Sequence, residues 1–456
     1  MLDVAIVGGG ISGLTLGFEL RERGIRAQVL EARSVAGGTI QTVEEDGFHF
    51  ETGPNGFLSR MPDTYLLAQR LGLQEQIISA SPAAKTRYLF LGGELKPLPS
   101  GPFGLLGTST LPLGARLRVF KEPFVRRRPA GLSEETVAGF VERRLGAAFV
   151  DTYVDAFVSG VFAGDPHRLS MDAAFPAMVA AEANHGSLVR GAMRSARARK
   201  KTNTNIPKGL LSFRGGMGVL IRALEEELGT DGLQLNTPVK GLKRATEGWE
   251  VQTDDELLTA RSVVVATPAY RASALIEEID ADCASQLSEI PYAPVCVVGL
   301  GFERDQVRHP LDGFGYLCPE KEGRPILGCL FTSSVYAGCR APANRVLLRI
   351  MLGGIRHPET IDGSDVEVVE RALGEVRGPL GIKGDPCWTR MVRWERAIPQ
   401  YHLGHQARVV GLRERLADTN PGLFLHGNAY EGVSVNDCIR TSGILADRII
   451  SELSSS

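Results

Sequence analysis

The sequence predicts an α/β protein in which a dinucleotide-binding domain is interleaved with a mixed-sheet substrate domain and a mainly helical subdomain. Three observations predict this arrangement. The chain opens with a strand, a glycine-rich turn, a helix and a second strand. Apolar strands near 261–268 and 423–425 have the composition of strands that return to such a sheet. Residues 113 to about 200 have helical character, whereas residues 291–395 alternate strands with turns.

The opening βαβ unit carries a phosphate-binding turn. Apolar residues 4–7 run into the motif Gly-Gly-Gly-Ile-Ser-Gly, a helical stretch follows, and the next strand ends on Glu31. Gly8 permits the tight turn, Gly10 lets the backbone approach a pyrophosphate, and Gly13 lets the helix pack closely on the strand. The helix N-terminus attracts the anion, and Glu31 is placed to accept hydrogen bonds from a ribose diol. The unit is therefore Rossmann-like and predicts dinucleotide binding.

The residues after Glu31 indicate which dinucleotide is bound. A second turn, Arg-Ser-Val-Ala-Gly-Gly-Thr at 33–39, follows the acid directly, and a short β excursion closes at 50–57. A nicotinamide dehydrogenase normally continues into another β–α repeat. The Arg-x-x-x-Gly-Gly turn instead resembles the amine-oxidase-like flavoprotein superfamily, where it runs beside the FAD pyrophosphate and the flavin. This resemblance implies that FAD is the cofactor.

Composition and charge narrow the function further. A formal net charge of −2 over 456 residues argues against bulk nucleic-acid binding. The 7 cysteines have no C-x-x-C spacing and the 8 histidines have no metal-ligand spacing, so neither a disulfide framework nor a metal site is expected. We recognise no signal peptide and no apolar run of transmembrane length. These features predict a cytoplasmic protein, with peripheral contact on the cytoplasmic face of a membrane as an alternative.

Six segments of the chain are expected to build the three domains. The boundaries follow shifts in pattern and Pro/Gly-rich stretches. The segments are 1–84, 208–270 and 409–456 for FAD binding, 85–112 and 271–408 for the substrate domain, and 113–207 for the helical subdomain.

Local patterns predict the individual elements. Residues 87–98 form a hairpin around a Gly-Gly turn, and a Pro/Gly-rich loop follows at 99–112. The run Ser-Glu-Glu-Thr at 133–136 marks the start of a helix at 137–145. The other expected elements are a helix at 219–228, a C-terminal helix from about 437 to 453, and strands at 233–235, 239–242, 249–253, 295–302 and 346–352.

Four motifs point to one family. They are Glu-Thr-Gly-Pro-Asn-Gly-Phe at 51–57, Phe-Val-Ser-Gly-Val-Phe-Ala-Gly-Asp-Pro at 157–166, Ser-Phe-Arg-Gly-Gly-Met at 212–217, and Gly-Asn-Ala-Tyr-Glu-Gly-Val-Ser-Val-Asn-Asp-Cys-Ile at 427–439. With them, nearly the whole chain resembles the oxygen-dependent, FAD-containing protoporphyrinogen oxidase and coproporphyrinogen III oxidase family of haem synthesis. The resemblance implies a FAD-binding domain of the p-hydroxybenzoate-hydroxylase and amine-oxidase type.

The resemblance also assigns substrate-binding residues. It implies that Arg87 anchors a substrate carboxylate, for which a guanidinium is suited through two parallel hydrogen bonds. Phe314 and Leu317 would hold a substrate ring between them, and Met351 would line the same slot. Gly160 would let the backbone approach the macrocycle. Without the resemblance, an ordinary core role would be expected for the two ring-holding residues.

On the cofactor side, the resemblance places Asn55 next to the flavin as an orienting residue, and it assigns no certain catalytic residue. The C-terminal helix would aim its N-terminus at the flavin and so favour the reduced state. Val239 would supply backbone to the adenine. The cofactor-binding residues expected are Gly8, Gly10, Ser12, Gly13, Glu31, Ala32, Arg33, Gly37, Gly38, Thr39, Gly53, Pro54, Asn55, Val239, Gly427, Val433 and Val435.

The family implies three successive two-electron oxidations that convert a porphyrinogen to a porphyrin. Each transfers a hydride to the flavin, and oxygen reoxidises the flavin with release of hydrogen peroxide. One anchoring arginine fits the two carboxylates of protoporphyrinogen IX more easily than the four of coproporphyrinogen III, which stays open as the alternative. A flavin amine oxidase, a carotenoid desaturase and a non-enzymatic flavin-loaded scaffold are more remote alternatives.

Beyond the porphyrinogen and oxygen, expected partners are hypotheses: transfer of product to ferrochelatase, a homodimer, and a membrane surface. Basic and apolar residues mix at 116–128, and a second basic run occupies 190–201. Such patches can hold a peripheral enzyme on anionic lipid. A solvated helical face is the favoured alternative, because Pro123 interrupts a continuous amphipathic helix.

Overall fold

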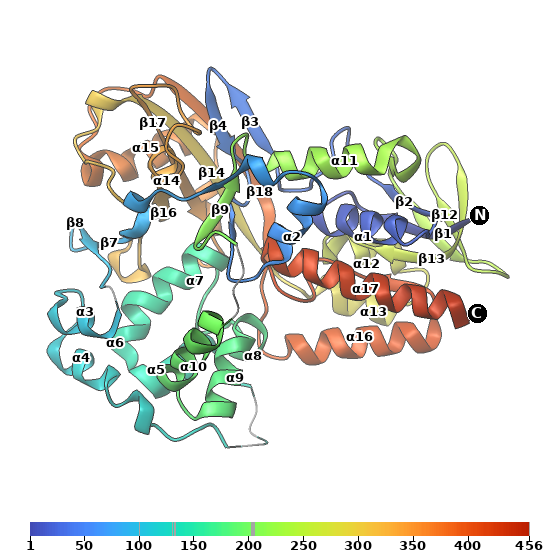
Figure 1. Ribbon diagram of the computed structural model, residues 1–456, viewed down its shortest axis with the longest axis horizontal. Coiled ribbons are helices and arrows are strands. Elements are labelled where there is room, and N and C mark those ends of the chain that lie inside the picture. The colour runs from blue at the N-terminus through green and yellow to red at the C-terminus, as the bar shows by residue number, and fades with distance from the viewer. Residues whose placement is uncertain (100, 130, 132–133, 202–205, 456) are drawn as a thin grey trace.

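Two seven-stranded sheets lie at opposite ends of the long axis of the molecule, and a helical region covers one side of the second (Figure 1). The computed structural model describes residues 1–99, 101–129, 131, 134–201 and 206–455. Both chain termini lie at the end formed by the first sheet. None of the helices in these ranges is long and apolar enough to cross a bilayer.

The first sheet collects strands from three distant parts of the chain. Its order is β10-β2-β1-β13-β12-β11, with β19 paired to β13. The strands are β1 (Leu2–Val7), β2 (Ala27–Leu30), β10 (Leu233–Gln234), β11 (Gly241–Arg244), β12 (Trp249–Gln252), β13 (Leu257–Val265) and β19 (Leu423–Leu425). Strand β1 pairs in parallel with β2 and β13, and all its residues from Val4 to Val7 are buried. A central parallel strand covered on both faces is apolar throughout, which is the pattern seen here.

Helices cover both faces of this sheet. Val4 and Ile6 face a core formed with α1 (Ile11–Glu22), α11 (Gly218–Gly232) and α17 (Val435–Ser455). Ala5 and Val7 face the opposite core, formed with α12 (Ala269–Ile276), α13 (Ala281–Ser288) and α16 (His405–Thr419). Alternate residues of β1 thus pack into different cores, as the two-residue period of a strand requires.

The second sheet has the order β18-β14-β17-β16-β15-β7-β8. Its strands are β7 (Tyr88–Leu91), β8 (Glu94–Pro97), β14 (Tyr292–Glu303), β15 (Gly315–Leu317), β16 (Ile326–Leu330), β17 (Arg345–Gly353) and β18 (Trp388–Pro399). Helix α15 (Asp365–Leu380) packs on one face, and a capping box between Ser364 and Glu367 fixes its start. Phe48 and Phe50 of β4 (Phe48–Glu51) pack on the other face against Trp388.

The helical region comprises α3 (Gly101–Gly107), α4 (Leu113–Val119), α5 (Val137–Leu145), α6 (Ala147–Phe149), a π-helical turn (Val150–Val154), α7 (Asp155–Phe162), α8 (Met171–Ala174), α9 (Pro176–His185) and α10 (Leu188–Lys201). The Thr136 side chain caps α5 by accepting from the Gly139 amide. A buried ion network holds these helices together, because Arg144 bonds both Glu122 and Glu182. Breaking such a network leaves an uncompensated buried charge, so it fixes the packing of this region.

Short elements connect the three parts. The hairpin β3 (Thr42–Glu45) and β4 (Phe48–Glu51) leads to a small sheet with the order β5-β9-β6, and α2 and α14 lie nearby. Their bounds are β5 (Phe57–Leu58), β6 (Ile77–Ser79), β9 (Leu210–Phe213), α2 (Asp63–Arg70) and α14 (Thr332–Val335).

Several expectations needed correction. The stretch 99–112 is not all loop, since α3 forms within it. The strand expected at 239–242 begins only at Gly241, because its first ladder partner on β12 is Gln252. The C-terminal helix begins at Val435 and is longer than expected. Ser133, part of the expected helix start, lies outside the described residues. The domain boundaries stay a prediction, although the sheets draw their strands from alternating segments of the chain.

Candidate active site

The first glycine turn forms a tight cradle at the start of α1. The Gly8 amide donates to the Leu30 carbonyl at 2.8 Å, and the Gly9 amide donates to Glu31 Oε2 at 2.7 Å. A Cβ on Gly13 would lie 2.0 Å from the Gly8 carbonyl oxygen, so this close packing excludes any side chain there. A Cβ on Gly10 would meet nothing within 4 Å, so the space in front of the turn is open.

The second glycine turn lies directly against the first. The Gly37 amide donates to the Gly9 carbonyl at 2.7 Å, and Gly37 and Gly10 form an isolated parallel bridge. The Arg33 amide donates to Glu31 Oε1 at 3.0 Å, and its guanidinium donates to the Gly38 carbonyl at 3.0 Å. The first glycine turn and the Arg-x-x-x-Gly-Gly turn are therefore connected by hydrogen bonds into one unit.

These residues fit a dinucleotide on physical grounds. No side chain caps the N-terminus of α1 at Gly10, so its first amides remain available to a phosphate. Ser12 lies in this first turn, and its carbonyl accepts from Ser442 of α17. Ala32 is exposed beside the buried Glu31, at the edge where a ribose would bind.

The segment predicted to serve the adenine runs beside the second strand. The Asn236 amide donates to the Arg33 carbonyl at 3.0 Å, and the Thr237 amide donates to the Glu31 carbonyl at 2.8 Å. Val239 follows two residues later and is partly buried against the second core of the first sheet. Its assignment to the adenine stays a prediction.

A cavity of about 1420 Å³ opens between the second sheet, the helical region and residues 39–58. It is lined mainly by apolar side chains. The predicted site residues that line it are Thr39, Gly53, Pro54, Asn55, Arg87, Gly160, Phe314, Leu317, Met351, Val433 and Val435. Thr39 is the last residue of the second glycine turn, and the other predicted residues of the two turns, with Val239 and Gly427, are not among the lining residues. The cavity therefore receives the residues assigned to the substrate and some of those assigned to the flavin, whereas the residues assigned to the pyrophosphate and the adenine lie outside it.

The charged residues that line the cavity share one sign. Lys85, Arg87 and Arg349 are the charged side chains among its described lining residues, and all three are basic. Lys85 and Arg87 are exposed, whereas Arg349 is buried. The Arg87 guanidinium lies 5.3 Å from the centroid of the Phe314 ring, in a cation–π arrangement. The cavity thus suits an apolar molecule that carries negative charge.

Gly160 lies within α7 and lines the cavity. A Cβ there would be 2.5 Å from Leu317 Cδ2, so the missing side chain also lets α7 approach Leu317, one of the two residues expected to hold a substrate ring. Its contact with the macrocycle stays a prediction.

Asn55 is one of the residues that line the cavity. Both its Oδ1 and its Nδ2 are buried, and neither has a hydrogen-bond partner among the described residues. An unpartnered buried amide is costly, so a bound molecule that supplies a donor or an acceptor would relieve it. This observation supports a role for Asn55 in orienting a ligand.

Two residues that the sequence analysis missed hold the preceding backbone. Arg349 donates from Nε to the Glu51 carbonyl at 3.0 Å and from Nη2 to the Gly53 carbonyl at 2.7 Å. Trp394 donates from Nε1 to the Thr52 carbonyl at 3.0 Å. Burial lowers the pKa of Arg349 to about 10. The sequence signal that could have identified Arg349 is that it is a lone arginine within the apolar strand at 346–352.

The C-terminal segment closes the site from another side. Val433 and Val435 line the cavity where α17 begins, and the Ser434 hydroxyl accepts from the Asp437 amide at 3.2 Å. Asn436 is turned away, since its side chain bonds Thr64 and the Leu58 carbonyl. The N-terminus of α17 therefore faces the cavity with a serine cap.

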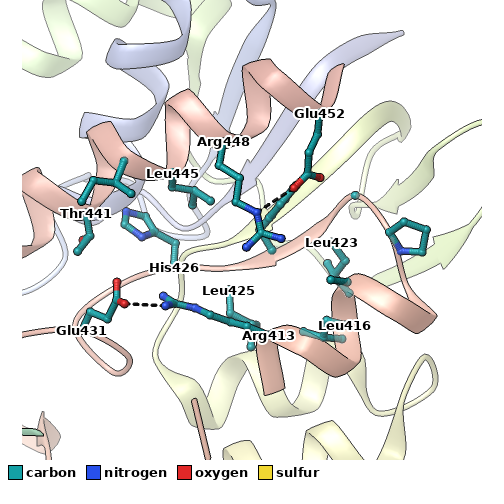
Figure 2. Close-up of a pocket in the computed structure, with 15 residues that line it drawn as sticks. Arg413, Leu416, Leu423, Leu425, His426, Glu431, Thr441, Leu445, Arg448 and Glu452 are labelled. Atoms are coloured by element: carbon teal, nitrogen blue, oxygen red, sulfur yellow. Dashed lines mark hydrogen bonds and ion pairs between the residues drawn. The ribbon is translucent and has the colours of Figure 1, made fainter. Parts of the chain in front are cut away.

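A smaller hollow of about 300 Å³ lies between α16, β19 and α17 (Figure 2). Its arginines are paired, Arg413 with Glu431 at 2.7 Å and Arg448 with Glu452 at 2.8 Å. His426 is buried there, bonds Ser442, and has its pKa lowered by burial to about 4. These side chains satisfy one another, and none of the predicted site residues lines this hollow.

The chain matches the family model for flavin containing amine oxidoreductase over residues 11–450. It is 32% identical to the mitochondrial protoporphyrinogen oxidase of Nicotiana tabacum, over 99% of this chain and 95% of that protein. It is 29% identical to the coproporphyrinogen III oxidase of Bacillus subtilis (strain 168), over 96% and 95%. A crystal structure from Exiguobacterium sp. 255-15 superposes with a TM-score of 0.84 at 24% identity, covering 98% of each chain.

These similarities cover nearly the whole chain. The α/β fold expected from the sequence is confirmed, and so is the flavin cofactor, FAD. The chain therefore belongs to the flavin-containing amine oxidoreductase family, in the branch that contains protoporphyrinogen and coproporphyrinogen III oxidases.

Proposed function

We propose that this protein oxidises a porphyrinogen to a porphyrin in haem biosynthesis. Three two-electron rounds remove six electrons, and three molecules of oxygen leave as three molecules of hydrogen peroxide. Curated relatives that align over nearly their whole length carry this activity in their names. The cavity supports the same conclusion independently, because its lining suits a large apolar ring with carboxylates.

The observation that carries the proposal is the charge of the cavity. Its walls are apolar, and its charged side chains are the three cations Lys85, Arg87 and Arg349 in the described part of the lining. A reduced tetrapyrrole has a broad apolar ring and negative propionates. An amine substrate would instead need an acceptor for its ammonium group, and no aspartate or glutamate lies among the described lining residues. The amine oxidase alternative is therefore disfavoured.

The side chains divide the work. Arg87 would bind a propionate through charge-assisted hydrogen bonds while its other face stays on the Phe314 ring. Phe314 and Leu317 would hold the macrocycle in one plane, and the buried, unpartnered amide of Asn55 would orient a ligand group that reaches it. Bound FAD supplies the two-electron redox chemistry, with oxygen as final acceptor. The chain's contribution is therefore mainly positioning.

No strong protein base is required by this scheme. The pyrrole nitrogens can release protons after hydride loss, so proton transfer does not depend on a side chain. The described lining residues include no histidine and no acid. Burial, and then the hydrogen bond that the Tyr88 hydroxyl donates to Asp312, raises the pKa of Tyr88 to about 12. These features agree with catalysis by positioning.

Protoporphyrinogen IX is the favoured substrate. The two exposed cations, Lys85 and Arg87, line the cavity two residues apart, and the Arg87 guanidinium lies over the Phe314 ring. This arrangement suits two carboxylates on one edge of the macrocycle. Coproporphyrinogen III, with four carboxylates, is the alternative, and a relative with that name aligns equally well along the chain.

The test is aerobic porphyrin fluorescence with purified FAD-loaded protein. Protoporphyrinogen IX and coproporphyrinogen III are supplied in parallel, and each rate is corrected for autoxidation. We expect turnover of both, with the faster rate for protoporphyrinogen IX. A faster rate with coproporphyrinogen III would reverse the substrate choice. Background rates with both substrates, despite bound FAD, would refute the proposed function.

We also propose that the surface around α4 docks on an anionic membrane. Leu113, Leu117 and Phe124 are 66%, 53% and 82% exposed, and Phe120 lies between this surface and the cavity. Arginines and a lysine alternate with them at 116–121. Co-sedimentation with anionic liposomes at low salt, lost at high salt, is the expected result. Transfer to ferrochelatase and a homodimer stay predictions.

A further inference from the structure

Three consecutive backbone carbonyls are held by side chains of the second sheet. Arg349 of β17 bonds the carbonyls of Glu51 and Gly53, and Trp394 of β18 bonds the carbonyl of Thr52 between them. These carbonyls lie immediately before Pro54 and Asn55, and both of those residues line the cavity. The two donors therefore fix the position of that segment relative to the substrate wall, where Met351 also lies.

The charges behind this segment do not balance. The Arg349 guanidinium is buried, and Glu51 is the carboxylate whose charge acts on it. Glu51 is also the carboxylate nearest to a second buried guanidinium, with Arg340 Nη2 at 3.9 Å. The cluster thus contains two cations and one anion. Burial raises the pKa of Glu51, and any proton that it takes up adds to the positive excess.

Arg349, one of the two cations in this cluster, borders the cavity. Arg349 and Gly53 both line the cavity, and within the described residues the third guanidinium nitrogen, Nη1, has only the weak acceptor Met351 Sδ at 3.5 Å. A buried charge without an equal partner is costly, so the fold retains it only if something else is gained. A negative charge that forms in the cavity would be strongly stabilised there, because the local dielectric is low.

We propose that Arg349 is the buried counter-charge for the anionic reduced flavin, and that it also positions residues 51–55 beside the flavin. The negative charge of reduced flavin is delocalised over the pyrimidine side of its ring, so a fixed cation nearby favours the reduced form. This inference rests on FAD binding and on the predicted flavin-side position of Gly53. It does not rest on which molecule is oxidised.

The test compares Arg349→Lys with Arg349→Gln. Both variants lose the two-pronged geometry of the guanidinium, but only glutamine removes the charge. The midpoint potential of bound FAD is measured by slow reductive titration against a reference dye, without any substrate. For Arg349→Gln we expect at least a tenfold loss of preference for reduced over oxidised flavin, equivalent to about 30 mV more negative for a two-electron couple. Arg349→Lys should stay close to wild type.

Two control variants separate the effect of the Arg349 charge from the effect of holding the backbone carbonyls of residues 51–53. Trp394→Phe removes the neighbouring hydrogen bond to Thr52 without changing the charge, and it should leave the potential unchanged. Arg345→Gln alters an arginine of the same strand that pairs with Glu303 in a half-exposed salt bridge, and it should also have no effect on the potential.

The alternative source of negative charge is a substrate carboxylate. An unchanged potential in Arg349→Gln, with a tenfold higher KM for a porphyrinogen, would assign the cation to the substrate and overturn the proposal. Equal shifts in the lysine and glutamine variants, or loss of FAD from both, would show that geometry matters and charge does not. A wild-type protein that binds FAD without oxidising porphyrinogens would refute the proposed function but leave this comparison interpretable.

Discussion

The glycine turns around α1 and the cavity wall around Phe314 are held together by different kinds of contact. The turns rest on backbone hydrogen bonds, such as Gly37 to Gly9 at 2.7 Å, between residues close in sequence. The cavity wall joins side chains from β7, α7, β15 and β17, which lie far apart along the chain. One region is set by backbone geometry and the other by packing.

The difference has consequences for tolerance. Where backbones touch, an added methyl group has no space and the neighbouring atoms cannot rotate away. Where side chains line a wide cavity, a truncated residue leaves room for water or for the ligand to shift. Replacing a tightly packed glycine in the turns around α1 should therefore abolish FAD binding. Replacing a residue of the cavity wall should only lower the affinity for the substrate.

The largest effect is expected from Gly13→Ala. The new Cβ would lie 2.0 Å from the Gly8 carbonyl oxygen, so helix and turn must separate. We expect the purified variant to lose its bound FAD, measured by the flavin absorbance relative to protein. Gly374→Ala, in α15 with nothing within 4 Å of its Cβ, is the matched control and should retain FAD. Full flavin occupancy in Gly13→Ala would show that the turn is less rigid than its distances indicate.

An intermediate effect is expected from Arg87→Ala at the other end of the molecule. Loss of a charge-assisted carboxylate contact costs about 1.5–3 kcal/mol, so the KM for a porphyrinogen should rise roughly 10- to 100-fold. Bound FAD and kcat should change little, because Arg87 lies far from the glycine turns in the fold. Steady-state kinetics on flavin-loaded protein would check this. Loss of flavin from the variant would mean that Arg87 has a structural role and that the two regions are coupled.

The same contrast explains what the sequence could predict. Gly8, Gly13 and Glu31 are close in the chain, and their spacing alone indicated a dinucleotide turn that the structure contains. Arg87, Phe314 and Met351 came only from resemblance, because nothing local distinguishes a cavity residue from a core residue. The structure places them in one cavity, and their binding roles stay predictions.

Long-range contacts account for what the sequence analysis missed. Arg349 bonds carbonyls 298 and 296 residues away, and Trp394 bonds one 342 residues away. No pattern within a strand shows which distant backbone it will meet. Gly160 shows the same kind of long-range contact, since a Cβ there would meet Leu317 of β15. Helix limits moved for a local reason, as at Val435, where Ser434 supplies the cap.

The smallest effect concerns how the helical wall of the cavity is attached to the sheet. Asp155 of α7 bonds Arg356, Arg356 contacts Glu320, and His357 Nε2 lies 2.6 Å from Glu320 Oε1. The hydrogen bond with Glu320, and secondarily the one with Glu359, raises the pKa of His357 above its usual value. The folded protein therefore holds this proton more tightly than the unfolded chain does.

This linkage has a definite direction. The stabilisation is complete below the unfolded pKa of about 6.5 and is lost as pH rises through the higher folded pKa. Because the pair is solvent-accessible, the loss should stay below about 1 kcal/mol. Urea unfolding of wild type and His357→Gln from pH 5.5 to 8.5 would isolate it, since the difference in unfolding free energy should shrink with rising pH. A constant difference would show that His357 is not protonated in this contact, and that α7 is joined to this segment by Arg356 and by the Glu320 amide, which donates to Asp155 at 2.7 Å.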